Sequence, residues 1–196
     1  MYPDRKADIL DAFMRLVERF GFDKTTMNDV AKEVGISVGV IYKDFKNKED
    51  LVDNCIQRIT QQFSFLADQI LEQDLPSEQR LHDLIINQFQ NIGKLSMENR
   101  GLWQYLHGEC LKYFREYEPL QDNDPVGIMK KIEWIMAKGL EDGCFEIEDI
   151  PKTAALFMCA FKGLFSDLVF INKNLDEVLQ NAEAMLALLI RAIKAR

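Results

Sequence analysis

Apolar residues recur every three or four positions along most of this chain, which is the spacing that places them on one face of an α-helix. The first such segment, residues 4–20, includes Ile9, Phe13 and Leu16 and stops at Gly21. The same spacing returns in further segments at residues 47–73, 81–92, 99–117, 125–140 and 174–196. Together with shorter segments between them, the pattern predicts an all-α fold of about nine helices, and no segment reads as a strand.

Two short helices are expected before the long segment that begins at residue 47. Thr25 and Thr26 precede the first of them, where a hydroxyl can accept a hydrogen bond from a free backbone amide, and Gly35 ends it. Ser37 can cap the second short helix, which would bury Ile41. Two short helices joined by a turn that contains glycine form a helix-turn-helix.

The long helix is expected to be capped by Asn47 and to end before Pro76. Its apolar stripe comprises Val52, Ile56, Ile59, Phe63, Leu66 and Ile70. Near the C-terminus, Asn174 and Glu177 have the spacing of a capping box for the last helix. These signals predict helices whose ends are set locally.

The charge of the chain constrains where an anionic partner can bind. The formal net charge is −8, and residues 1–54 carry nine basic and eleven acidic side chains. Because phosphate neutralisation needs basic side chains, any DNA-binding face must be a local patch. Lys43, Lys46 and Lys48, with only Asp44 among them, supply such a patch.

Composition excludes several classes of protein. Hydrophobic residues make up 47% of the chain, enough for a packed core, but no apolar run of about 18 residues predicts a membrane span. The N-terminus lacks the apolar stretch of a secretion signal. The four cysteines are scattered and form no CxxC pair, which favours reduced thiols. We therefore expect a cytoplasmic protein without a membrane partner.

No catalytic or cofactor motif is present. The sequence contains no GxSxG, P-loop, HExxH or dinucleotide-binding fingerprint, so we expect neither an enzyme nor a cofactor. His107 and Cys110, three residues apart, form a conceivable metal half-site, but the sequence does not place further ligands beside them. We therefore expect no metal site.

Residues 9–51 resemble the TetR (tetracycline repressor) family of regulators. The resemblance is carried by Gly21, Thr25-Thr26, Ile36-Ser37, Gly39, Ile41-Tyr42, Phe45, Lys48-Glu49 and Leu51. It covers about the first quarter of the chain. Two positions depart from the family, since Val38 stands where many members have a basic or polar residue, and Asp44 where the family often has an aromatic residue or histidine.

The resemblance implies a transcriptional regulator in two domains. Residues 1–46 would form the helix-turn-helix DNA-binding domain, and residues 47–196 an effector-binding and dimerisation domain, linked by the helix over 47–73. The expected function is repression by a homodimer that binds a palindromic double-stranded DNA operator and is released by a small, mostly apolar effector. The alternatives are a constitutive DNA-binding dimer, an activator without ligand control and, from another class, a helical dimeric adaptor or an enzyme.

The expected DNA contacts lie in and around the helix-turn-helix. Phosphate contacts are assigned to Thr26, Ser37, Tyr42, Lys46 and Lys48. Gly39 would let the backbone approach DNA, while Val38 and Val40 could touch thymine methyl groups and Lys43 guanine or phosphate. The full predicted set comprises Thr25, Thr26, Ser37, Val38, Gly39, Val40, Tyr42, Lys43, Lys46 and Lys48.

The other candidate site residues are assigned to an effector pocket or to a dimer interface. Aromatic residues are dense in the middle of the chain, and ordinary core packing explains them as well as an apolar effector pocket does. The predicted effector set comprises Phe63, Phe89, Trp103, Tyr105, His107, Cys110, Trp134 and Phe161. The wide apolar face of the last helix suits core or a helix bundle between two subunits. The predicted dimer set comprises Phe165, Leu175, Leu179, Ala182, Met185, Leu186 and Leu189.

Overall fold

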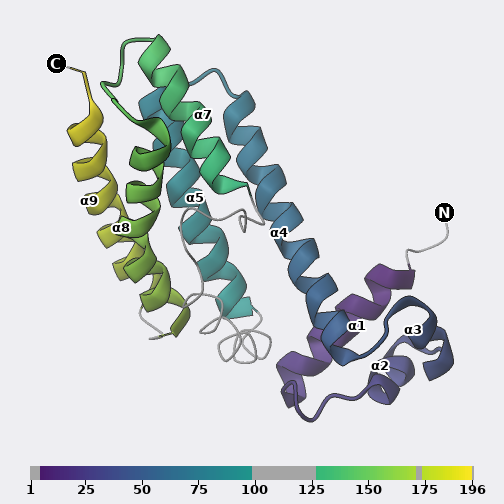
Figure 1. Ribbon diagram of the computed structural model, residues 1–196. Coiled ribbons are helices and arrows are strands. Elements are labelled where there is room, and N and C mark those ends of the chain that lie inside the picture. Colours follow the sequence, from purple (N-terminus) through teal and green to yellow (C-terminus); the bar gives the residue numbers. More distant parts are fainter. Residues whose placement is uncertain (1–4, 99–126, 171–173, 196) are drawn as a thin grey trace. The chain divides into compact units, whose positions relative to one another are not determined.

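The structure is a computed structural model that describes residues 5–98, 127–170 and 174–195 (Figure 1). These residues form the helices α1 (Arg5–Phe20), α2 (Met27–Val34), α3 (Val38–Asp44), α4 (Lys48–Glu72), α5 (Ser77–Glu98), α7 (Ile128–Glu141), α8 (Ile150–Phe170) and α9 (Leu175–Ile193). The described part contains no strand beyond a single backbone bridge between Phe145 and Lys194. The all-α prediction is confirmed, and the helix predicted over 99–117 lies outside the described residues.

Packing divides the described residues into two compact units. Unit 1 contains residues 5–60 and 96–98, and unit 2 contains residues 61–95, 127–170 and 174–195. The division falls within α4, which runs without a break from one unit into the other. None of the helices in the described part is long and apolar enough to cross a membrane.

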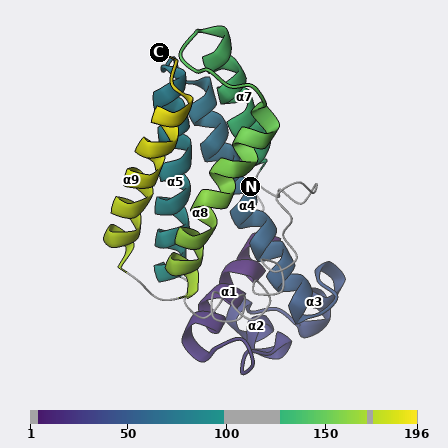
Figure 2. The same cartoon turned by 60° about the vertical axis from the view of Figure 1, so that its left-hand side comes forward.

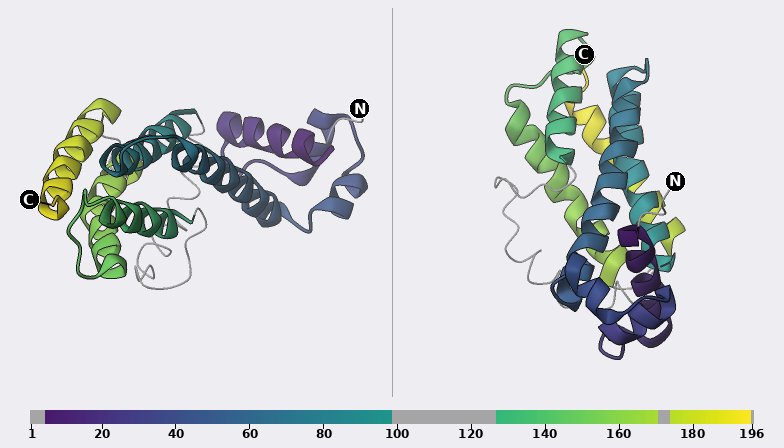
Figure 3. Two further views of the ribbon diagram at one scale, coloured as in Figure 1. Left: turned by 90° about the horizontal axis from the view of Figure 1, so that it is seen from above. Right: turned by 90° about the vertical axis from the view of Figure 1, so that its right-hand side faces the viewer.

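Unit 1 is built around α1, α2, α3 and the first half of α4 (Figure 3). The three- and four-residue spacing of α1 buries one face against the other helices. The core of the unit contains Ile9, Phe13, Val17, Val30, Ile41, Phe45 and Leu51, all at most 1% exposed. Gly21 and Gly35 adopt φ values of 83° and 76°, which favour glycine, and they follow α1 and α2 directly.

The apolar stripe predicted for α4 is wrong at one position. Leu66 is 40% exposed, whereas Ala67 beside it is buried, and Cys55 is buried in place of the half-buried Ile56. A straight helix has 3.6 residues per turn, so a strict four-three repeat drifts away from the buried face over several turns. Burial raises the pKa of the Cys55 thiol to about 12, which keeps it protonated at neutral pH.

Unit 2 is a helical bundle with a single large core. Helix α8 packs against both α7 and α9 (Figures 1 and 2), and α9 buries a residue about every fourth position. Fully buried members of this core include Leu81, Leu84, Phe89, Ile132, Ile135, Phe161, Val178, Ala182 and Leu186. This apolar core holds the C-terminal helices together.

The predicted N-caps of α4 and α9 are both present, but one of them has a different partner. The Asn47 side chain accepts a hydrogen bond from the Asp50 amide at 2.8 Å, as predicted for the start of α4. Asn174 caps α9, but its partner is the amide of Asp176, at 3.0 Å, instead of the predicted box with Glu177. The φ and ψ of Asn174, −58° and 127°, place its side chain over the second amide of the helix.

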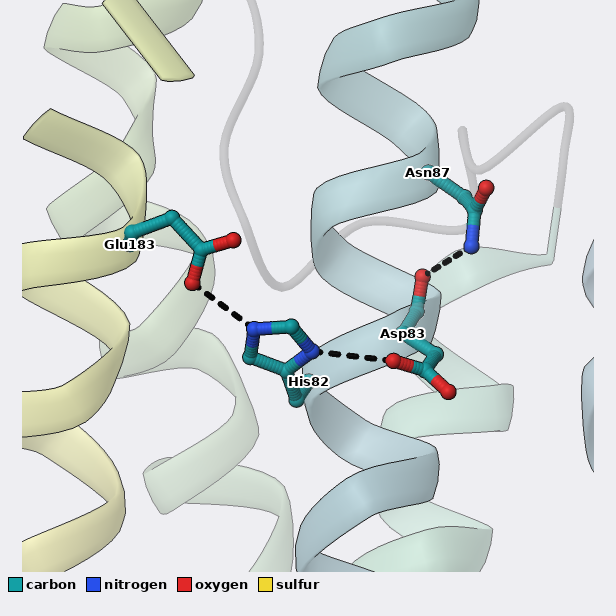
Figure 4. A network of polar contacts seen from close by, with 4 residues as sticks. All are labelled: His82, Asp83, Asn87 and Glu183. Carbon is teal, nitrogen blue, oxygen red and sulfur yellow. Dashed lines mark hydrogen bonds and ion pairs between the residues drawn. The ribbon is translucent and has the colours of Figure 1, made fainter. Parts of the chain in front are cut away.

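A histidine joins α5 to α9 within unit 2 (Figure 4). His82 Nδ1 lies 2.9 Å from Asp83 Oδ1, and His82 Nε2 lies 2.7 Å from Glu183 Oε2. Burial lowers the pKa of His82, but hydrogen bonds to Asp83 and Glu183 and their negative charges outweigh that effect, and the pKa is raised. Protonated His82 therefore stabilises the contact between the two helices.

We expect this histidine to make stability depend on pH. Because its pKa is higher in the folded chain, its contribution is complete below the unfolded value of about 6.5 and is lost as pH rises through the folded value. The contribution should be at most about 1 kcal/mol, or roughly 2–4 °C, because solvent screens the partly exposed pair. The check compares melting temperatures of the wild type and His82→Gln at pH 5.5 and 8.5. A difference in melting temperature between the two proteins that grew with pH would contradict the stabilising role of protonated His82.

Candidate nucleic-acid interface

The first helix of the helix-turn-helix, α2, begins with a reciprocal cap. The Thr26 hydroxyl accepts a hydrogen bond from the Asp29 amide at 3.2 Å, and the Thr26 amide donates to Asp29 Oδ2 at 3.0 Å. Hydrogen bonds from the Thr26 hydroxyl and amide lower the pKa of Asp29 and keep it charged. A threonine cap is predicted here from the sequence, and Asp29 completes it as a capping box.

The turn after α2 is closed by the backbone. Gly35 donates to the carbonyl of Lys32 at 3.2 Å, and Ile36 donates to the carbonyl of Ala31 at 3.0 Å. This pattern uses the last free carbonyls of α2 and turns the chain towards α3. Ser37 occupies the N-cap position of α3, as predicted, but its side chain makes no capping hydrogen bond there.

Helix α3 is anchored on one side and open on the other. Ile41 is completely buried, and Phe45 directly after the helix is 1% exposed. Gly39 and Lys43 are four residues apart and lie on the side of the helix opposite Ile41. Both are exposed, and so is Tyr42 at 53%. The fold of unit 1 therefore presents one short helix with a polar outer face.

The predicted DNA-binding residues separate into three groups by exposure. The exposed ones are Thr26, Ser37, Gly39, Tyr42, Lys43 and Lys46. Val38, Val40 and Lys48 are half-buried, and Thr25 is 2% exposed. The structure thus brings six of the ten together as accessible groups in and around the helix-turn-helix.

Besides Thr26, two of the predicted residues make side-chain hydrogen bonds inside the domain. The Thr25 hydroxyl donates to the carbonyl of Gly21 at 2.9 Å. Lys48 Nζ donates to the carbonyls of Phe22 and Thr25, at 2.8 and 3.1 Å, and lies 4.0 Å from the centroid of the Phe22 ring. Lys48 thereby holds the turn between α1 and α2 against the first turn of α4.

The predicted effector residues are only partly described. Phe89 and Phe161 are fully buried in the core of unit 2, with ring centroids 5.7 Å apart, and Phe63 is half-buried. Trp134 is 41% exposed, with the Arg80 guanidinium 5.4 Å from its ring centroid. Trp103, Tyr105, His107 and Cys110 lie outside the described residues.

The predicted dimer residues mostly face the core of their own chain. Ala182 and Leu186 are completely buried there, and Leu175 approaches Gly93 of α5. The partly buried members, all packed against the same core, are Phe165, Leu175, Leu179, Met185 and Leu189. Leu156 on α8 and Leu188 on α9, which are not among the predicted dimer residues, are 59% and 61% exposed.

Potential metal ligands and thiols are scattered in the part of the chain that the structure covers. No group of three potential ligands lies together within the described ranges. Cys55, Cys144 and Cys159 are free thiols, and the half-site of His107 and Cys110 falls outside the described residues.

Two short helices around a glycine turn, packed on α1 and followed by a helical bundle, define a helix-turn-helix protein of all-α fold. Residues 9–55 match the family described as bacterial regulatory proteins, tetR family. This match agrees with the resemblance of residues 9–51 to the TetR family.

Relatives and solved structures agree with this assignment. An HTH-type transcriptional regulator, YhgD of Bacillus subtilis, is 34% identical over 97 residues, covering 48% of this chain and 51% of that protein. The regulator BetI of Vibrio parahaemolyticus is 29% identical over 115 residues, covering 55% and 57%. The matched part thus spans about half the length of these relatives. Both are named as regulators, in agreement with the expectation that this chain is not an enzyme.

Two solved structures show the fold over nearly the whole chain. SmeT, the repressor of the Stenotrophomonas maltophilia multidrug efflux pump SmeDEF, has a TM-score of 0.68 at 16% identity and covers 98% of this chain and 91% of its own. FadR of Bacillus subtilis, in complex with stearoyl-CoA, has a TM-score of 0.62 at 18% identity and covers 94% and 97%.

Proposed function

We propose that this chain is a cytoplasmic transcriptional regulator that reads a palindromic DNA operator with α3. The observation that carries the proposal is the outer face of that helix, where Gly39, Tyr42 and Lys43 are exposed while Ile41 fixes the helix from behind. A short helix held in this way can enter the major groove of DNA, whose width admits an α-helix.

Gly39 supports this assignment because no neighbour among the described residues requires a glycine there. A Cβ atom added at Gly39 would meet no atom of those residues within 4 Å, and its φ is not in the left-handed region. Glycine inside a helix costs about 1 kcal/mol relative to alanine. Such a glycine leaves room for a close approach by an outside molecule, which we infer to be the DNA backbone or a base edge.

The charge of the surroundings also supports a DNA partner. Lys43 and Lys46 are exposed and flank the end of α3. With Tyr42 and Ser37 they form a set of phosphate contacts that would fix the register of the helix on the duplex. Thr25 and Lys48 would contribute through the internal hydrogen bonds described above, as supports of the turn.

We further propose that two copies of the chain act together, each with an N-terminal DNA-binding domain of residues 1–46 and a C-terminal domain of residues 47–196. A two-fold dimer places two reading helices in successive major grooves and matches a palindromic operator. Exposed Leu156 and Leu188 on α8 and α9 support a contact between copies on the outer side of these helices. Size-exclusion chromatography with light scattering tests this, with Leu188→Glu as the disrupting variant.

A small, mostly apolar effector completes the proposed function, with repression as its direction. The support is a likeness of fold to a repressor and to a regulator solved with stearoyl-CoA. The proposed lining includes Phe63, Trp134 and the aromatic residues around 103–110. Titration of the protein–DNA complex with saturated fatty acids, and with their CoA thioesters as larger anionic comparisons, is a first test, and release of DNA by the fatty acids is the supporting result.

We expect Gly39→Ala to stabilise the protein while it weakens DNA binding. The added methyl group has open space, so the melting temperature should rise slightly, but it would intrude where DNA approaches. The dissociation constant should increase about tenfold or more. The measurement is fluorescence anisotropy with a duplex that the wild type selects from a random pool.

Gln57→Ala serves as the matched control, because Gln57 is exposed on α4 outside the predicted DNA-binding set. Its affinity should equal that of the wild type. If Gly39→Ala bound the selected duplex as tightly as the wild type, α3 would not be the reading helix.

A further inference from the structure

Asp44 is the one acidic residue within the basic stretch that ends α3. It lies between Lys43 and Lys46, next to residues assigned above to DNA contact. A free carboxylate there would repel phosphates and offset one of the two lysines. The fold does not leave it free, because its side chain is only 11% exposed and is bound by Arg5.

Arg5, the first described residue of α1, binds this carboxylate through two guanidinium nitrogens. Nη2 lies 2.6 Å and Nε 2.9 Å from the same oxygen, Oδ2. The pair joins residues 39 positions apart and ties the start of α1 to the end of α3. By contrast, Arg15 and Glu33, which join α1 to α2, approach only to 3.5 Å and are 62% and 42% exposed.

We propose that Arg5 is a positioning residue for DNA reading, which neutralises Asp44 and fixes the end of α3. If Arg5 turned to a phosphate, it would leave the nearly buried Asp44 carboxylate without its partner, which is costly. Arg5 therefore acts on DNA through Asp44 and not by direct contact. The proposal rests on the proposed function, because it concerns how the same helix reads DNA.

A double-mutant cycle separates this role from a direct phosphate contact. We expect Arg5→Gln to weaken binding to the selected duplex about tenfold, because it exposes the Asp44 charge and loosens α3. In an Asp44→Asn background, the same Arg5→Gln change should cost less than about twofold.

Arg15→Gln is the matched control on the same helix, and its affinity should stay within about twofold of the wild type. Melting temperatures of all variants ensure that affinity is compared between folded proteins. Equal losses from Arg5→Gln in both backgrounds would show a direct contact and overturn the inference. An affinity that Arg5→Gln left unchanged, with only the melting temperature lowered, would also overturn it. A wild type that bound no DNA would overturn the proposed function itself, a result that cannot be confused with either.

Discussion

Replacing Phe89 by alanine is expected to lower the free energy of unfolding by about 3–5 kcal/mol. The Phe89 ring is fully buried, stacks on Phe165 with centroids 4.0 Å apart and planes 4° apart, and meets the Phe161 ring edge-on at 5.7 Å. Its removal leaves a cavity and breaks two aromatic contacts. Thermal unfolding followed by circular dichroism should show a melting temperature lower by roughly 6–20 °C.

Phe65→Ala makes the same change at a phenylalanine of α4 that is 63% exposed, and its effect should stay within about 0.5 kcal/mol. This comparison also bears on the predicted effector pocket. A residue that lines an open pocket loses fewer contacts on truncation than one in a closed core. A loss below about 1 kcal/mol at Phe89 would contradict the packed core and favour the pocket.

A methyl group at Gly139 is expected to destabilise unit 2 by about 1–3 kcal/mol or more. Gly139 is buried on α7, and an added Cβ would overlap the ring of Phe145, which is itself 2% exposed. The ring cannot easily move, because the Gly139 carbonyl accepts hydrogen bonds from the amides of Cys144 and Phe145 at 2.8 and 2.9 Å. In urea denaturation, unit 2 of Gly139→Ala should unfold with its midpoint at a lower urea concentration than in the wild type.

Gly39→Ala again provides the comparison, since it adds the same methyl group where there is open space. Its midpoint should not fall. An unchanged midpoint for Gly139→Ala would mean that the loop after α7 yields to accommodate the methyl group, and that the contact between Gly139 and Phe145 contributes little to stability.

The sequence was most informative where structure is set by near neighbours. The ends of α1 and α2 were predicted closely, because Gly21 and Gly35 follow them and only a glycine adopts those φ values without strain. Leu66 shows the limit of such reasoning. Whether it or Ala67 faces the core depends on how α4 turns against other helices, and a repeat counted along one helix does not contain that information.

The candidate site was predictable in position more than in the role of each residue. Glycine, serine and lysine at the spacing of residues 35–46 located an exposed helix correctly. The same reasoning assigned Lys48 to phosphate, whereas its ammonium group is bound to carbonyls more than twenty positions earlier. The pair of Arg5 and Asp44 was missed for the same reason, because contacts between distant segments leave no periodic signal.

The hydrogen bonds of Lys48 also have a mechanical consequence. They fasten the start of α4 to the α1–α2 turn at two carbonyls, so this turn cannot act as a loose hinge. A rotation of α4 about its own axis would then be transmitted to α1, α2 and α3, which would move together. Together with the ion pair between Arg58 and Asp11 at 2.6 Å, this lysine contact would carry motion of α4 to the other helices of unit 1.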